Sequence, residues 1–116
     1  MQIKLLKSKI HRAKVTDANL DYEGSIAIDS DLMKHANIKD YEKVHVLDIT
    51  NGARLETYAI PDTPGSKSIC INGAAAHLVK TGDRVIILSY CSLDSFSSNA
   101  HKPTIIRLNQ ENSIKV

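Results

Sequence analysis

Short apolar runs, each interrupted by polar or charged residues, recur along the chain and predict a mainly β fold. Strands are expected at 3–6, 9–15, 25–28, 44–50, 53–60, 68–71, 84–90 and 103–108. Short helices are expected over 32–36, capped by Asp29 or Ser30, and over 73–79. Asn51 and Gly52 predict a type I′ turn between two of the strands. A Ser-rich loop is expected over 91–102 and a polar tail over 109–116.

The pattern contains an internal repeat. Residues 25–29 (SIAID) match residues 68–72 (SICIN), and residues 38–47 (IKDYEKVHVL) match residues 79–88 (VKTGDRVIIL). A short predicted helix with a histidine, His35 or His77, follows each first block. Chance similarity between two segments of like composition is the alternative. Two related halves suit a small closed barrel with pseudo-two-fold symmetry, which also removes exposed strand edges.

Composition limits the size and the partners of this fold. With 116 residues, 42% of them hydrophobic, the chain is expected to form a single domain, residues 1–116. Four Tyr, one Phe and no Trp predict an aliphatic core. A net charge of +2 does not by itself indicate a nucleic-acid partner. A chain this short has little surface with which to enclose an active site. An enzyme of this size would therefore form its site together with other copies of itself or use unusual chemistry.

Targeting signals and metal-ligand patterns are missing from the sequence. Charges interrupt every apolar run, which predicts neither a signal peptide nor a membrane span and makes the cytoplasm the expected location. Cys70 and Cys91 are isolated and are expected to be reduced thiols. The five histidines show no metal-ligand spacing, so no metal is expected.

Gly24 and Ser25 are the first candidate for chemistry. Most Gly-Ser pairs are only turns. A serine hydroxyl can, however, attack the preceding carbonyl, and glycine leaves that carbonyl unhindered and tolerates strained backbone. The resulting ester can eliminate, which cuts the chain and leaves a residue that hydrolyses to a pyruvoyl group.

Arg54 and Tyr58 are the second candidate, because strand alternation puts them on one face. A guanidinium beside a phenol suits a small anionic substrate, with Arg binding a carboxylate and Tyr supplying a proton. The alternative is an exposed strand with an Arg-Glu surface pair. Thr57 falls on the opposite face, so a bulge or strong twist is needed if Thr57 and Tyr58 serve one site.

Two further segments carry weaker signals. Asn72, Gly73, Ala74 and Ala75 open a predicted helix and could cradle an anion, although an N-capped helix packed on the barrel explains them equally well. Residues 1–14 hold five cations and no acid, and Lys9 and His11 can share one side of a strand. A solvated strand explains this segment better than a nucleic-acid arm, since interleaved aromatic residues are missing.

Together these segments resemble the pyruvoyl-dependent aspartate 1-decarboxylases, which make β-alanine for pantothenate synthesis. The matching pieces are residues 9–16 (KIHRAKVT), 21–25 (DYEGS), 27–29 (AID), 50–54 (TNGAR), 57–60 (TYAI), 72–77 (NGAAAH) and 82–87 (GDRVII). They run in family order and are highly specific in combination. Position 26 is Ile where some members have Cys, and the chain after Tyr90 carries no matching motif.

The resemblance implies a fold and a maturation step. The fold would be a six-stranded double-psi β-barrel with short helices, assembled as a homotetramer whose sites lie between subunits. The chain would cut itself between Gly24 and Ser25, giving a β chain (1–24) and an α chain (25–116) whose Ser25 becomes the pyruvoyl cofactor. Thr57 would support this step by binding the Gly24 carbonyl. The need for a maturation factor is not readable from the sequence.

The resemblance also implies the reaction and its residues. The pyruvoyl ketone would form a Schiff base with L-aspartate and accept electrons as CO2 leaves, without metal or pyridoxal phosphate. Tyr58 would return a proton, and Arg54 with Lys9 would hold the retained carboxylate. The rest of the site would be lined by Thr57, Asn72, Gly73, Ala74 and Ala75, with His11 and Tyr22 as second-tier candidates.

Two other functions fit a small β-rich chain with a basic start. One is a swapped-hairpin DNA-binding domain of the transition-regulator or antitoxin kind, and the other is an uncleaved barrel that only binds or regulates. The DNA-binding alternative leaves the Gly24–Ser25 pair, the Thr57–Tyr58 pair and the segment around Gly73 as coincidences.

Overall fold

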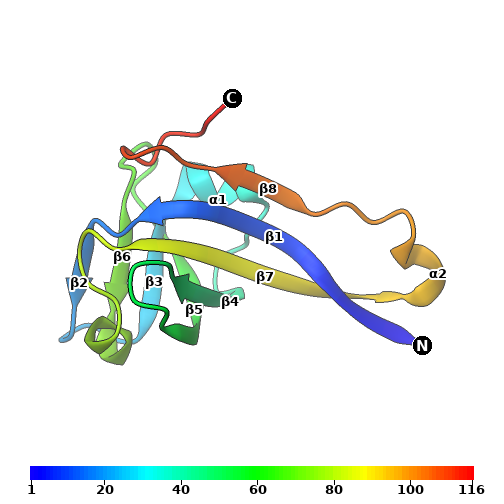
Figure 1. Ribbon diagram of the computed structural model, residues 1–116, viewed down its shortest axis with the longest axis horizontal. Helices are drawn as coiled ribbons and strands as arrows, with labels where there is room; N and C mark the ends of the chain where they lie inside the picture. Colours follow the sequence, from blue (N-terminus) through cyan, green and yellow to red (C-terminus); the bar gives the residue numbers. More distant parts are fainter.

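The computed structural model describes residues 1–116, and strands make up most of its regular structure (Figure 1). The strands are β1 (Gln2–Lys14), β2 (Asp17–Asn19), β3 (Ser25–Asp29), β4 (Lys43–Asp48), β5 (Arg54–Asp62), β6 (Ile69–Asn72), β7 (Arg84–Asp94) and β8 (Thr104–Arg107). The helices are α1 (Ser30–Ala36), the 3₁₀ helix η1 (Gly73–His77) and α2 (Ser95–Ser98). The mainly β prediction is confirmed. No helix is long and apolar enough to span a membrane.

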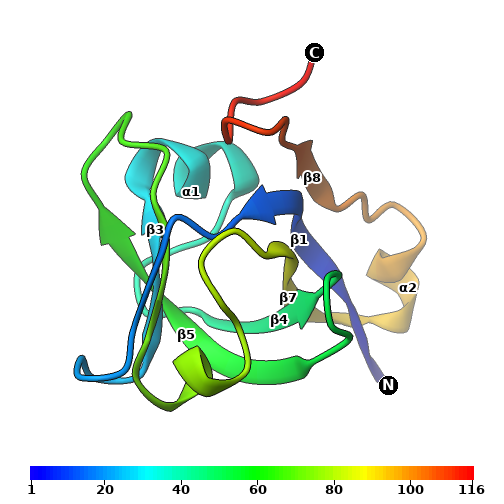
Figure 2. The ribbon, with the colours of Figure 1, turned by 60° about the vertical axis from the view of Figure 1, so that its left-hand side comes forward.

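The strands form one hydrogen-bonded order, β2-β6-β3-β5-β4-β7-β1-β8. Because only Val15 and Thr16 separate β1 from β2, the chain itself links the two sides of this order. The Val15 N–H donates to the carbonyl of Asp83 at 2.9 Å, and the Thr16 N–H donates to the carbonyl of Ile69 at 2.8 Å. The arrangement is that of a small barrel, in which β1 and β2 act as one segment and β8 pairs with β1 outside the ring (Figure 2). The expected six barrel strands therefore correspond to six segments, namely β1 with β2, β3, β4, β5, β6 and β7. The eighth strand, β8, is added outside the ring.

Strand pairing carries the pseudo-two-fold symmetry that the repeat predicts. β3 pairs antiparallel with β6, and Ala27 lies opposite Cys70, its equivalent in the repeat. β4 pairs antiparallel with β7, and Val46 lies opposite its equivalent, Ile87. Equivalent residues face each other in this way only across a two-fold axis. The remaining pairs agree, since β3–β5 and β6–β2 are both parallel and β4–β5 and β7–β1 are both antiparallel.

The core inside the barrel is aliphatic, as the composition predicts. Its largest fully buried side chains are Ile10, Ile26, Ile28, Leu32, Ile69, Ile71, Ile87, Leu108, Val15, Val44, Val46 and Val79. None of the five aromatic side chains belongs to it, since each is at least 37% exposed. The tyrosines are therefore available on the surface for contacts with ligands or other chains.

Asp29 begins α1, as the capping signal predicts. Its Oδ1 accepts the N–H of Asp31 at 2.8 Å, and α1 ends at Asn37, which has a left-handed φ of 60°. Asp29 also accepts the backbone N–H groups of Gly65 and Lys67 at 3.0 and 2.9 Å. Burial alone would raise the pKa of Asp29, but these backbone donors lower it overall. The buried carboxylate thus ties the β5–β6 loop to the start of α1.

The prediction of a type I′ turn at Asn51 and Gly52 is wrong. Gly52 has a positive φ of 80°, but Asn51 does not, whereas a type I′ turn needs both. Residues 49–53 form a longer connection in which the Gly52 N–H donates to the carbonyl of Asp48 at 2.8 Å. The Asp48 carboxylate also accepts the N–H of Thr50 at 2.8 Å, and these bonds hold the longer loop.

The two strands expected at the N-terminus form one strand with irregularities. β1 runs through Lys7, and its register against β7 shifts between Leu6 and Ser8 and again between Ile10 and Ala13. Arg12 lies inside the second irregularity with a φ of 66°. Both are bulges, which bend a strand without ending its pairing.

The Ser-rich segment is also more regular than expected. β7 continues to Asp94 because residues 90–94 pair with the start of β1, and the two strands extend beyond the barrel to α2 (Figure 1). The short strand β2 was not expected at all. In the tail, the Nδ2 of buried Asn112 donates to the carbonyls of Lys14 and Lys67, both at 2.9 Å. The polar tail therefore packs against the barrel rather than remaining solvated.

Candidate active site

Ser25 is the first residue of β3 and is only 3% exposed. It lies opposite Asn72 in the β3–β6 ladder. The Nδ2 of Asn72 donates to Ser25 Oγ at 3.1 Å, and Ser25 Oγ in turn lies 3.4 Å from the carbonyl oxygen of Glu23. A serine at the head of a strand, held by a buried amide and aimed back at the preceding chain, suits attack on a neighbouring carbonyl.

Asn72 was also expected as a possible N-cap of the following helix, and it does occupy the N-cap position of η1. The side chain of Asn72 makes no capping hydrogen bond to η1. Its Nδ2 is used for Ser25, and its Oδ1 accepts from the Cys70 thiol at 3.3 Å. Asn72 is 4% exposed, and its buried side chain holds the Ser25 hydroxyl by this hydrogen bond.

Gly73 packs against the segment that precedes Ser25. A Cβ at Gly73 would lie 2.7 Å from Gly24 Cα, 2.8 Å from Gly24 N and 3.0 Å from the carbonyl oxygen of Tyr22. The φ of Gly73 is +75°, a conformation that also favours glycine. Position 73 therefore requires glycine for two reasons, and its backbone forms one wall against residues 22–24. Gly24 itself is exposed.

The other small residues and Tyr22 are less enclosed. η1 has only five residues, of which Ala74 is exposed and Ala75 is half-buried. Tyr22 is 62% exposed. The structure therefore gathers Tyr22 and Gly73 beside Gly24, while the phenol of Tyr22 remains largely in solvent.

Tyr58 and Thr57 point to opposite faces of β5. Thr57 is half-buried like Leu55, whereas Tyr58 is 37% exposed and shares the outer face with Arg54. The β4–β5 register from Lys43 opposite Tyr58 to Leu47 opposite Arg54 has no bulge. The prediction that Arg54 and Tyr58 share a face is confirmed, and nothing re-aims Thr57 toward Tyr58.

Tyr58 lies near Ser25 because β3 and β5 are parallel neighbours. Ile26 pairs with Ala59, and both belong to the core. The residues one position earlier on each strand are Ser25 and Tyr58, so strand alternation points both side chains away from the core on adjacent strands. A phenol and the candidate serine are thus brought to the same side of the barrel.

Arg54 lies elsewhere on the same face. It lies four positions before Tyr58, which is about 13 Å along β5. Arg54 helps to line a cavity of about 190 Å³ with His45, Leu47, Leu55 and Glu56. Its guanidinium makes no ion pair or hydrogen bond. The Arg-Glu surface pair considered from the sequence is therefore not formed.

Lys9 and His11 lie on β1, which is separated from β3 by β7, β4 and β5. Burial and then the positive charge of Lys9 lower the pKa of His11, with smaller effects from other nearby cations. The Nδ1 of His11 is buried and has no hydrogen-bond partner. The structure thus places Lys9 near His11 but brings neither to Ser25 within one chain.

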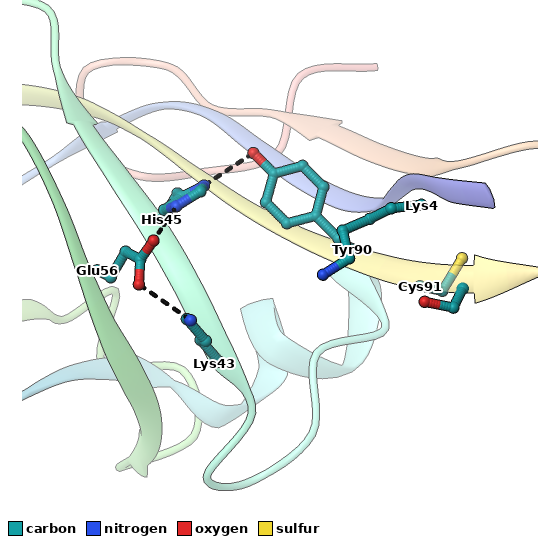
Figure 3. Close-up of a pocket in the computed structure, with 7 residues that line it drawn as sticks. Lys4, Lys43, His45, Glu56, Tyr90 and Cys91 are labelled. Atoms are coloured by element: carbon teal, nitrogen blue, oxygen red, sulfur yellow. Dashed lines mark hydrogen bonds and ion pairs between the residues drawn. The ribbon is translucent and has the colours of Figure 1, made fainter. Parts of the chain in front are cut away.

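A polar network on the same outer face was not predicted from the sequence. Tyr90, His45, Glu56 and Lys43 are connected across β7, β4 and β5, and they line a cavity of about 400 Å³ (Figure 3). Lys43 and His45 are two positions apart on β4 and therefore share a face. Glu56 lies directly opposite His45 on β5. The sequence alone could have shown that Lys43 and His45 share a face of their strand. It could not have shown the β4–β5 register, which places Glu56 opposite His45.

Comparison with known proteins identifies the family. The family model described as "Aspartate decarboxylase" matches residues 1–115. The aspartate 1-decarboxylase of Clostridium kluyveri is 57% identical over 114 residues, which are 98% of this chain and 90% of that protein. The enzymes of Clostridium novyi and Clostridium botulinum (strain ATCC 19397 / Type A) are 55% and 54% identical, covering 98% and 99% of this chain and 93% and 91% of theirs. No match supports the DNA-binding alternative, and the chain belongs to the aspartate decarboxylase family.

Proposed function

We propose that this protein is an aspartate 1-decarboxylase, which removes the α-carboxylate of L-aspartate as CO2 and releases β-alanine for pantothenate synthesis. The observation that carries the proposal is the arrangement around Ser25. A buried serine follows a glycine, its Oγ accepts from Asn72 Nδ2 at 3.1 Å, and Gly73 packs on the glycine. Membership of the aspartate decarboxylase family supports the same activity.

The first proposed step is self-cleavage between Gly24 and Ser25. Ser25 Oγ attacks the Gly24 carbonyl carbon, the C–N bond breaks, and an ester replaces the peptide. Removal of the Ser25 α-proton then expels Gly24 as a carboxylate and leaves dehydroalanine. Water converts this residue into a ketone and releases ammonia. The products are chains of residues 1–24 and 25–116, the second with a pyruvoyl group at its start.

The residues around Ser25 fit a pyruvoyl group. Asn72 Nδ2 is a buried donor already directed at the side chain of residue 25, and a ketone oxygen can accept it. No side chain larger than that of glycine fits at position 73, because its Cβ would collide with Gly24. When formed, the pyruvoyl ketone supplies a covalent attachment point for the substrate amine and an acceptor for the electrons released with CO2.

Tyr58 is proposed to supply the proton that replaces the lost carboxylate on the substrate α-carbon. Its phenol lies on the outer face, on the strand beside Ser25. Thr57 is proposed to act earlier, by binding the Gly24 carbonyl as negative charge develops during cleavage. Because Thr57 and Tyr58 point to opposite faces of β5, the two residues suit two separate steps.

Arg54 and Lys9 are proposed to hold the carboxylate that the product keeps. Both lie far from Ser25 within one chain, so we place them in the site of a neighbouring copy within a homotetramer. Half-buried apolar side chains on the same outer face, Leu47, Ile86 and Leu88, support a contact with another copy there. A guanidinium without an internal partner is available for a substrate carboxylate.

The mass of the intact, denatured protein tests self-cleavage. The wild-type chain should give two pieces, residues 1–24 and 25–116, and Ser25→Ala should give one uncut chain without decarboxylase activity. Ser68→Ala is the matched control, because Ser68 is the repeat equivalent of Ser25 but follows Lys67 rather than glycine. This control should be cut and active.

The outcomes separate self-cleavage from assisted maturation. A wild-type chain that remains whole after warming but is cut on incubation with cell extract would show that a maturation factor is required. A chain that is whole under both conditions would contradict the proposal.

A further inference from the structure

Four polar side chains form a connected row on the outer face of β7, β4 and β5 (Figure 3). The hydroxyl of Tyr90 lies 2.9 Å from His45 Nδ1, and His45 Nε2 lies 2.8 Å from Glu56 Oε1. The other carboxylate oxygen, Oε2, lies 2.9 Å from Lys43 Nζ. Both oxygens of Glu56 are therefore occupied by side chains of β4.

Hydrogen-bonding capacity fixes the roles in this row. An ionised carboxylate only accepts, so His45 Nε2 must carry a hydrogen. In neutral His45, Nδ1 then accepts from the Tyr90 hydroxyl, and in charged His45 it donates to the same oxygen. Tyr90 can serve either form, so His45 donates to Glu56 in both.

Glu56 lies midway between two residues of the proposed site. Arg54 and Tyr58 are two positions before and after it on β5, and all three side chains are exposed on the same face. Arg54 and Glu56 also line the same cavity of about 190 Å³. A guanidinium and a carboxylate so placed can pair, and such pairs often form two hydrogen bonds.

Glu56 nevertheless pairs only with β4. The hydrogen bonds from His45 and then Lys43 lower the pKa of Glu56, so it remains an anion at neutral pH. This anion would compete with a substrate carboxylate for Arg54 if it were free to turn. In the structure it is held by two donors, and Arg54 has no partner.

We propose that His45 and Lys43 are positioning residues that hold Glu56 away from Arg54 and so leave the guanidinium free for a dicarboxylate substrate. Tyr90 holds His45 in place through the hydrogen bond between its hydroxyl and His45 Nδ1. The inference rests on the proposed function only in the role given to Arg54. A structural role is the competing explanation, since His45 and Glu56 are also a directly opposed cross-strand pair.

The test is a release-and-rescue experiment on the purified, processed protein. The double variant Lys43→Ala/His45→Ala should raise the KM for L-aspartate about two- to fivefold, the strength of an exposed ion pair, with little change in kcat. Adding Glu56→Gln to this variant should restore KM, because a neutral amide cannot form an ion pair with Arg54. Glu56→Gln alone should leave KM close to the wild-type value.

Succinate gives a second readout that needs no decarboxylation, because it carries two carboxylates and no amine. Its Kd, measured by calorimetry, should rise by the same factor in the double variant and return with Glu56→Gln. An unchanged KM and Kd in the double variant, a loss that Glu56→Gln does not rescue, or wild-type protein that binds no succinate would each overturn the inference. Succinate binding with the expected pattern but without aspartate turnover would instead overturn only the proposed function.

Discussion

At the scale of single residues, Gly73 separates two effects that a glycine can have. Its positive φ costs any other residue about 1–2 kcal/mol, and its contact with Gly24 leaves no space for a Cβ. Gly52 has a similar φ of +80°, but a Cβ there would meet nothing within 4 Å. The two positions share the backbone conformation, but only Gly73 is buried and in contact with the segment before Ser25.

We expect Gly73→Ala to slow cleavage roughly tenfold to hundredfold, because relief of a 2.7 Å contact displaces Gly24 from Ser25 Oγ. Gly52→Ala is the control and should be destabilised by a similar backbone cost while it is cut at the normal rate. The fraction of cut chain, followed by mass over time, measures both. Equal cleavage rates in the two variants would remove Gly73 from the processing site.

The sequence predicted the candidate site best at the scale of single residues. Ser25, Asn72 and Gly73 lie together as the motifs suggest, because motif residues at strand ends are placed by short-range chain geometry. Contacts across strands were not predicted. Glu56 was considered as a partner of Arg54, two residues away, but it pairs with His45 because β4 lies opposite β5 in a register that one strand alone does not specify.

At the scale of elements, the β4–β5 connection depends on a buried acid. Asp48 is 2% exposed, accepts the Thr50 N–H, and has an Oδ2 without a hydrogen-bond partner. Burial, together with nearby Asp83, raises the pKa of Asp48 to about 6. This explains why the turn prediction failed, since its residues are organised by the carboxylate before them and not by Asn51 and Gly52 alone.

The raised pKa of Asp48 has a defined consequence for stability. The folded state favours the protonated carboxyl, so the folded protein binds more protons and loses stability as the pH rises from about 4 to above 6. Asp48→Asn keeps an acceptor for Thr50 and removes the charge. It should raise the free energy of unfolding by about 1–3 kcal/mol at pH 8 and much less at pH 4.

Urea unfolding of the wild type and Asp48→Asn at both pH values measures this difference. The same gain at pH 4 and pH 8 would show that the benefit does not come from removal of a buried charge. A loss of stability at both would show that the carboxyl hydrogen bonds matter more than the charge.

Elements were predicted unevenly for physical reasons. β3, α1 and the core of β7 follow from apolar runs and from the Asp29 cap. The extension of β7 to Asp94 was not predicted, because its polar residues pair with β1 from the other end of the chain. β2 has only three residues and is defined by its pairing with β6, so it has no local signal of its own.

At the scale of the whole molecule, one chain does not bring all the proposed site residues together. Ser25 and Tyr58 lie on adjacent strands, whereas Lys9 lies on β1, three strands further on, and Arg54 lies about 13 Å along β5 from Tyr58. The proposed homotetramer would resolve this separation by bringing Arg54 of one copy to Ser25 and Tyr58 of the next.

Hybrid oligomers test this arrangement. Arg54→Ala and Tyr58→Phe should each decarboxylate poorly as pure proteins. Refolded or co-expressed together, they should recover up to about a quarter of wild-type activity, since one site in four then combines an intact Tyr58 from one copy with an intact Arg54 from another. Activity no greater than the mean of the two pure variants would show that both residues serve the same copy.

The pseudo-two-fold axis has a consequence for the origin of the processing site. The axis makes Ser68 the counterpart of Ser25, but Lys67 stands where the other half has Gly24, and its N–H is bonded to Asp29. A duplicated ancestor would have carried the same strand start twice. In such a duplicated fold, the proposed cut would break the peptide bond before Ser25 in one half, while the equivalent bond between Lys67 and Ser68 would stay intact and keep the other half of the barrel continuous.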